Sequence, residues 1–208
     1  MLERILPATV RSAHTRTDPP EPMLFPAEAA LVGNAVEKRR QEFATVRHCA
    51  RSALAELGIA PVPILPGVRG APVWPEGIVG SMTHCAGYRA AAVARTAEIA
   101  GLGIDAEVHG PLPEGVLDLV SSEAEREHLA SLPPGVHWDR LLFSAKESVY
   151  KVWSPRTGEW LGFEEASVSF EAGVFTARLL RPGPWTEVSG HYLVEDGIVV
   201  TAVALPSD

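Results

Sequence analysis

The chain has 208 residues, of which 46% are hydrophobic and 21% charged, so it can bury a sizeable core in one or two units. Its formal net charge is −8, and a polyanion would therefore have to bind a local basic cluster rather than a globally positive surface. These values argue against a nucleic-acid partner. No stretch approaches the roughly 18 apolar residues of a membrane span, so we expect no membrane association.

The cysteines and the amino-terminal segment bear on the compartment. Cys49 and Cys85 lie outside any CxxC or Cys/His ligand spacing, and Met1–Arg16 has no continuous apolar run of the kind that a signal peptide contains. These features predict a cytoplasmic protein.

A long helix is predicted over residues 27–57, between a proline-rich segment and Gly58. At 100° per residue, Arg40, Arg47 and Arg51 lie along one edge of its apolar face. These arginines are either a solvated charge stripe or cations that face a phosphate-binding cleft, and the helix alone does not decide between the two.

Residues 60–80 are rich in proline and glycine, which predicts a loop. Thr83 and His84 then close an apolar strand before a small-residue turn at Ala86-Gly87. The apolar runs 89–95 and 99–107 predict two strands of a buried sheet, paired through a hairpin at residues 96–98.

The rest of the chain predicts two helices followed by strands. The first helix covers 121–132, with Ser122 as its cap and Glu125 three residues on, and the second covers 138–153. The later segments read as an antiparallel meander with strands at 166–170, 174–178, 191–194 and 198–204. The order of elements predicts an α+β protein of two halves, residues 1–103 and 104–208.

Asp105 and Glu107 stand two residues apart at the end of an apolar strand, so both carboxylates project from one face. Two carboxylates this close repel each other unless a cation or a proton lies between them, and a hard divalent ion such as Mg²⁺ suits them. The alternative is a pair of solvated turn residues.

A second group of charges lies on the helix at 138–153. Glu147 and Lys151 form an i, i+4 pair, with Lys146 beside them. An exposed pair of this kind contributes only about 0.3–0.5 kcal/mol, but the helix is too apolar for free solvation. Buried charges need partners or a function.

Three segments of the chain together resemble the phosphopantetheinyl transferases of the surfactin and enterobactin synthetase type. They are the Thr83-His84 strand end, the Asp105/Glu107 strand end and the charged helix at 138–153. The family has a Ser/Thr-His element, a Gly-x-Asp-x-Glu strand and a Phe/Trp-x-x-Lys-Glu-(Ser/Ala)-x-x-Lys helix. The matching segments here are Thr83-His84, Gly103-Ile-Asp105-Ala-Glu107 and Phe143-Ser-Ala-Lys146-Glu147-Ser-Val-Tyr-Lys151. The arginine-rich segment 39–51 also resembles the enterobactin-type subgroup common in actinobacteria.

The resemblance implies a pseudo-twofold monomer of two similar α/β halves, with coenzyme A as substrate and Mg²⁺ as cofactor in the cleft between them. By this resemblance, Asp105, Glu107 and Glu147 ligate Mg²⁺, and Glu147 and Lys151 are the catalytic residues. The residues that the resemblance assigns to coenzyme A are Arg40, Arg47, Arg69, Thr83, His84, Lys146 and Lys151. The general base is either Glu147 or a water on the metal.

The implied reaction transfers the phosphopantetheine group of coenzyme A to a serine of an acyl or peptidyl carrier protein and releases 3′,5′-ADP. Two alternatives are a non-catalytic module that binds coenzyme A or a carrier protein, and a metal-dependent phosphoesterase. The carrier could contact residues 111–132, whose apolar side chains could equally pack into the core.

Overall fold

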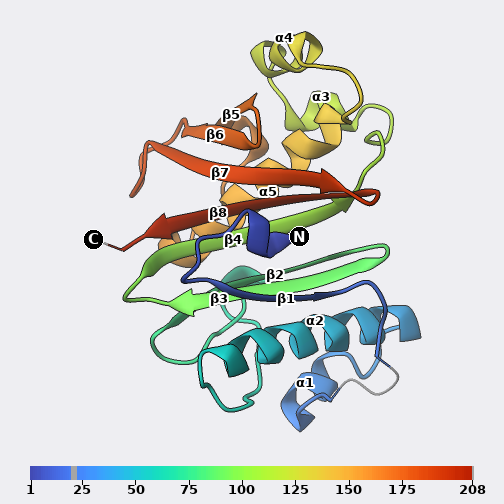
Figure 1. The fold of residues 1–208 in the computed structure, drawn as a ribbon, viewed down its shortest axis with the longest axis vertical. Helices are drawn as coiled ribbons and strands as arrows, with labels where there is room; N and C mark the ends of the chain where they lie inside the picture. The colour runs from blue at the N-terminus through green and yellow to red at the C-terminus, as the bar shows by residue number, and fades with distance from the viewer. Residues whose placement is uncertain (20–22, 208) are drawn as a thin grey trace.

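Two antiparallel sheets, each covered by a 20-residue helix, make up the α+β fold, as Figure 1 shows. The computed structural model describes residues 1–19 and 23–207. Within these ranges, no helix has both the length and the apolar character needed to cross a membrane. The predicted fold class is confirmed.

The first half contains a sheet with the strand order β1-β3-β2. Its elements are a 3-10 turn at Leu2–Arg4, β1 (Arg11–Thr15), α1 (Pro26–Leu31), α2 (Glu37–Glu56), a 3-10 turn at Val68–Gly70, β2 (Ile78–Cys85) and β3 (Tyr88–Arg95). β2 and β3 form a hairpin through Ala86-Gly87, where Gly87 has φ 76°, a left-handed conformation that glycine adopts without a steric penalty. The predicted turn is confirmed.

The second half contains a sheet with the order β4-β8-β7-β6-β5. Its elements are β4 (Ile99–Val108), α3 (Val116–Val120), α4 (Glu123–Ser131), α5 (Trp138–Thr157), a 3-10 turn at Phe163–Glu165, β5 (Ala166–Glu171), β6 (Val174–Leu179), β7 (Glu187–Glu195) and β8 (Ile198–Pro206). The predicted meander of the last four strands is confirmed. The predicted cap of α4 is also confirmed, because Ser122 Oγ accepts a hydrogen bond from Glu125 N (3.2 Å).

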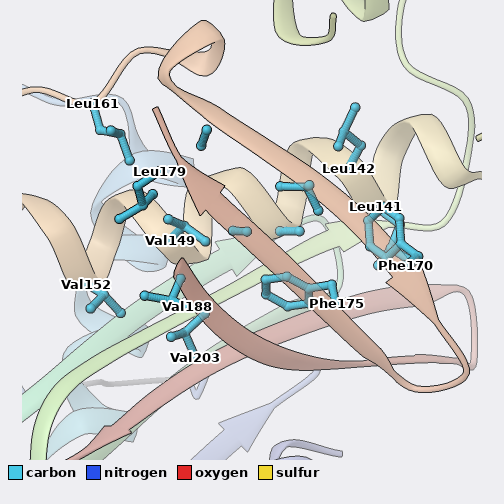
Figure 2. Close-up of a cluster of buried hydrophobic side chains, with 14 of the residues drawn as sticks. Leu141, Leu142, Val149, Val152, Leu161, Phe170, Phe175, Leu179, Val188 and Val203 are labelled. Atoms are coloured by element: carbon cyan, nitrogen blue, oxygen red, sulfur yellow. The ribbon is translucent and has the colours of Figure 1, made fainter. Parts of the chain in front are cut away.

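Three apolar clusters join these layers. In the first half, α2 packs through Ala50 and Leu54 on one face of its sheet, and the other face of β3 meets β4 and β8 through alternating alanines. The third cluster lies between α5 and the far face of the larger sheet, where Val149 and Phe175 are buried (Figure 2). The layers therefore stack in the order helix, sheet, sheet, helix.

Two predicted helix boundaries are wrong. The range 27–57 holds two helices rather than one, because α1 ends at Leu31 and α2 begins at Glu37. Gly33 and Asn34 lie in the turn between them, and both residue types disfavour helix interiors. The second long helix continues past its predicted end at residue 153 and through Pro155 to Thr157, where Gly158 (φ 71°) caps it.

The predicted hairpin at residues 96–98 is also wrong. β3 pairs with β1 and β2, whereas β4 pairs with β8, so the chain passes from one sheet to the other at this turn. The predicted boundary between residues 103 and 104 accordingly falls inside β4. Side chains of β2 connect the two halves, since Ser81 Oγ and Thr83 Oγ1 accept hydrogen bonds from Ile104 N and Ala106 N, each at 3.0 Å.

Gly103 lets β4 approach α5 closely. A methyl group added there would overlap the Ser148 carbonyl and lie 2.9 Å from Val152 Cγ2. We expect Gly103→Ala to lower the free energy of unfolding by about 1–3 kcal/mol, the usual cost of overpacking a core. Urea denaturation measures the effect. Gly110→Ala is the control, because nothing lies within 4 Å of its added methyl group, and equal losses in the two variants would contradict the prediction.

Candidate active site

A cavity of about 640 Å³ opens between the two halves, with walls from α2, β2, β4, α5 and the loop around residues 66–74. Its cationic side chains come from both halves and are Arg39, Arg47, Arg69, Lys151 and Arg156. Thr83 and His84 also line it. A cavity of this size and charge can enclose a nucleotide-sized phosphorylated ligand.

Arg47 is held rigidly at the wall of the cavity. It is only 7% exposed, its Nε donates a hydrogen bond to Ile64 O (3.0 Å), and its guanidinium carbon lies 3.3 Å from the centre of the Phe43 ring. Burial lowers the pKa of Arg47 to about 10, so the group stays protonated at neutral pH. This arginine is thus a fixed cation rather than part of a solvated stripe.

His84 and Arg39 form a pair on the same wall, with Arg39 Nη1 2.9 Å from His84 Nε2. An arginine can only donate, so Nε2 accepts and His84 is the neutral tautomer with its proton on Nδ1. Burial, which lowers the pKa of His84, agrees with this state. The sequence reasoning missed Arg39, although the positions Arg39, Phe43 and Arg47 follow an i, i+4, i+8 spacing that would have identified it.

Two of the predicted phosphate ligands lie apart from the cavity walls. Arg40 is exposed beside Glu37, at 3.9 Å. Lys146 is buried and donates to Glu125 Oε2 (2.9 Å) and to Phe163 O (2.8 Å). Lys151 follows Lys146 by five positions, and at 100° per residue the two side chains point about 140° apart around the helix axis. The structure therefore does not bring Arg40 and Lys146 to the cavity with the other predicted phosphate ligands.

Arg69 reaches the cavity from the loop after α2. Its backbone has φ 53°, which is uncommon for a residue with a Cβ, and its Nε donates to Gly158 O (3.0 Å) at the end of α5. This contact closes one side of the cavity across the two halves.

Asp105 stands where the cavity meets the second half. Its Oδ1 accepts hydrogen bonds from Lys151 Nζ (2.8 Å) and Thr83 Oγ1 (3.2 Å), and Lys151 also donates to Ile104 O (3.1 Å). Its Oδ2 is buried and has no hydrogen-bond partner among the described residues. A buried carboxylate oxygen in this state can accept a further cation or proton.

Glu107 and Glu147 share the surroundings of Asp105. Burial and, next, the charge of Asp105 raise the pKa of Glu107, although its ion pair with Arg140 Nη1 (3.0 Å) opposes the shift. Burial also raises the pKa of Glu147, with Lys151 opposing and Asp105 adding to the shift. The charge of Asp105 therefore acts on both of the other carboxylates. The sequence reasoning missed Arg140, which lies two helical turns before Glu147 on the same face.

The predicted metal ligands are not assembled around one point. Within residues 1–19 and 23–207, no three acidic, histidine or cysteine side chains stand in position to hold a metal ion. Lys151 and Arg140 hold Asp105 and Glu107 instead. The donor set nevertheless suits Mg²⁺, since Mg²⁺ prefers oxygen ligands and Asp105 Oδ2 is buried without a partner.

A site of this kind suits a phosphorylated, nucleotide-sized ligand. The profile of the 4'-phosphopantetheinyl transferase N-terminal domain matches residues 27–94, and that of the 4'-phosphopantetheinyl transferase superfamily matches residues 101–203. The chain is 56% identical to 4'-phosphopantetheinyl transferase Svp of Streptomyces mobaraensis, over 99% of this chain and 89% of that protein.

Two further relatives are similar to the chain. PptT of Mycobacterium tuberculosis is 48% identical over 99% of this chain and 98% of its own length. Enterobactin synthase component D of Salmonella typhimurium is 36% identical over 65% of this chain and 57% of its own. The chain therefore belongs to the 4'-phosphopantetheinyl transferase superfamily, whose enzymes transfer the phosphopantetheine group of coenzyme A to carrier proteins. The predicted family, function and enzyme class are confirmed.

Proposed function

We propose that coenzyme A binds in the 640 Å³ cavity. Arg47, Arg69 and His84 contact phosphate groups remote from the reacting phosphorus, and Lys151 lies beside the pyrophosphate. The single observation that carries this proposal is the position of Lys151, which lines the cavity and lies 2.8 Å from Asp105. Under this proposal, the scissile phosphate lies where the two halves meet.

We further propose that Asp105, Glu107 and Glu147 hold Mg²⁺. When bound, the ion supplies positive charge that neutralises the pyrophosphate. Lys151 and Thr83 orient Asp105, and Arg140 orients Glu107. Arg140 also donates to Gly110 O (3.2 Å), which connects Glu107 to the loop before α3.

The carrier serine must lose a proton as its oxygen bonds to phosphorus and the bond to 3′,5′-ADP breaks. Glu147 or a water molecule accepts this proton. Burial raises the pKa of Glu147, which favours it as the base, whereas ligation of Mg²⁺ would make this carboxylate a weaker base. The ammonium group of Lys151 stabilises the negative charge that develops on the 5′-phosphate of the leaving 3′,5′-ADP.

Incubation with coenzyme A, Mg²⁺ and a panel of apo carrier proteins tests the function directly. The panel includes a carrier domain of an enterobactin synthase, because that assembly is named in the Salmonella relative. Transfer predicts a mass gain of one phosphopantetheine group on the carrier. Release of phosphate without this gain would indicate hydrolysis, and an unchanged mixture would indicate binding alone.

We propose that the carrier docks on the surface formed by α3 and α4. In α3, Leu119 is 79% exposed, whereas Val120 is only 4% exposed and Leu117 packs against the core. Carrier contact and core packing, the two alternatives for residues 111–132, therefore apply to different side chains of α3. Leu119 is available for contact, and its neighbour Val120 belongs to the interior.

Leu119→Glu is expected to raise the KM for the carrier about tenfold, equivalent to roughly 1.4 kcal/mol of lost contact, without changing the KM for coenzyme A. Steady-state kinetics with each substrate varied in turn measure both constants. Val120→Glu is the matched control and should lower the melting temperature instead. An unchanged carrier KM in Leu119→Glu would exclude this docking surface.

We also propose that the enzyme is a cytoplasmic monomer. The free thiols of Cys49 and Cys85 support a reducing compartment.

A further inference from the structure

Glu28 is a fully buried carboxylate in the first half, 0% exposed, at the third position of α1. Its oxygens accept hydrogen bonds from Phe25 N (2.9 Å), Ile64 N (2.9 Å) and Arg51 Nη1 (2.9 Å). One carboxylate thus joins the start of α1, the loop after α2 and α2 itself. Backbone and arginine donors therefore satisfy both oxygens of this buried carboxylate.

Glu125 occupies the matching place in the second half. It is the third residue of α4, is buried, and accepts hydrogen bonds from Ser122 N (2.8 Å), Val168 N (2.8 Å) and Lys146 Nζ (2.9 Å). In both halves, a carboxylate near the start of a short helix binds the preceding cap residue, a later backbone N–H group and a cation of the long helix. The two buried carboxylates thus have the same kinds of partner, although the sequence shows no evident internal repeat.

The two buried carboxylates differ in whether a cation that they contact lines the cavity. In the second half, Glu125 contacts Lys146, which does not line the cavity. In the first half, Glu28 Oε1 also lies 3.5 Å from Arg47 Nε, and Arg47 does line the cavity. The same Ile64 that donates to Glu28 through its N–H accepts from Arg47 Nε through its carbonyl. Glu28 therefore contacts Arg47 both directly and through the backbone of Ile64.

We propose that Glu28 is a positioning residue for coenzyme A, one that holds the Arg47 guanidinium against the Phe43 ring and directs its remaining N–H groups into the cavity. This inference rests on the proposed role of Arg47 in binding a phosphate. Burial lowers the pKa of Arg47, and the charges of Arg51 and Arg39 lower it further. The negative charge of Glu28 opposes this shift. Preorganisation of this kind lowers the cost of ordering the arginine when the ligand binds.

The test is a double-mutant cycle on the full chain with Glu28→Gln, Arg47→Ala and the two combined, and with Glu125→Gln as the matched control. Calorimetric titration with coenzyme A, steady-state kinetics and thermal melts are recorded for each. We expect Glu28→Gln to weaken coenzyme A binding about tenfold while kcat and the carrier KM change little. In the Arg47→Ala background, Glu28→Gln should cause almost no further loss of affinity.

The control separates positioning from stability alone. Glu125→Gln should lower the melting temperature and leave coenzyme A affinity unchanged. Unchanged affinity in Arg47→Ala would overturn the proposed binding site itself. If Arg47→Ala weakens binding but Glu28→Gln matches Glu125→Gln, or adds its full effect in the double mutant, the positioning role is wrong. Glu28→Asp provides a second variant, since it keeps the charge but withdraws it from Arg47, and it should show the same selective loss of affinity.

Discussion

Asp105→Asn is expected to slow carrier modification by about a hundredfold to a thousandfold, the loss typical of removing a preorganised electrostatic group from an active site. The amide keeps the size of the side chain and can still accept the hydrogen bond from Thr83. It removes the negative charge that faces Lys151 at 2.8 Å and the buried oxygen available to a cation. Mass spectrometry of the carrier over time measures the rate.

The same variant should require a higher Mg²⁺ concentration for half-maximal rate, because one of the proposed ligands has lost its charge. Asp196→Asn is the control, since Asp196 is exposed in the turn between β7 and β8, outside both the cavity lining and the proposed docking surface. Its rate and Mg²⁺ requirement should match those of the unaltered enzyme. A near-normal rate of Asp105→Asn at limiting Mg²⁺ would exclude Asp105 from the metal site.

Lys146→Ala is expected to lower the free energy of unfolding by about 3–5 kcal/mol, because it leaves Glu125 buried without its cation. The lost side chain also donates to Phe163 O, so the contact between α5 and the turn before β5 is weakened. Since Lys146 does not line the cavity, the KM for coenzyme A should stay unchanged under conditions where the variant is folded. Urea denaturation and steady-state kinetics check the two expectations separately.

Lys151→Ala is the comparison for this prediction, on the same helix and with the same change of residue type. It should lose activity with a smaller effect on stability, because its ammonium group is partly exposed at the cavity. A raised KM for coenzyme A in Lys146→Ala, at an unchanged melting temperature, would restore the phosphate-binding role that the motif alone implied.

Several features of this fold follow from residues only a few positions apart, and the sequence predicts them. The cap of α4 depends on Ser122 and Glu125, and the final meander depends on alternation within each strand. Asp105 and Glu107 were expected on one face of their strand, and both carboxylates meet side chains of α5. The spacing of the three motifs was enough to identify the family.

Contacts between distant segments could not be predicted in this way. The run after residue 98 was expected to pair with β3, but it pairs with β8, about a hundred residues later. Both pairings satisfy the same apolar pattern, so the pattern does not distinguish them. The choice depends on how the two sheets pack, with Ser81 and Thr83 of β2 binding the backbone of β4.

The sequence by itself determined the family, the chemistry of the charged residues and most of the helices and strands. Only the tertiary structure decided which charges serve the cavity and which hold the halves together. Helical periodicity gives the direction in which a side chain points around the helix axis, but not which residue of another segment lies opposite it. Arg39 faces the cavity whereas Arg40 faces solvent, and Lys146 meets Glu125, 21 residues earlier in the chain, because packing brings those partners there.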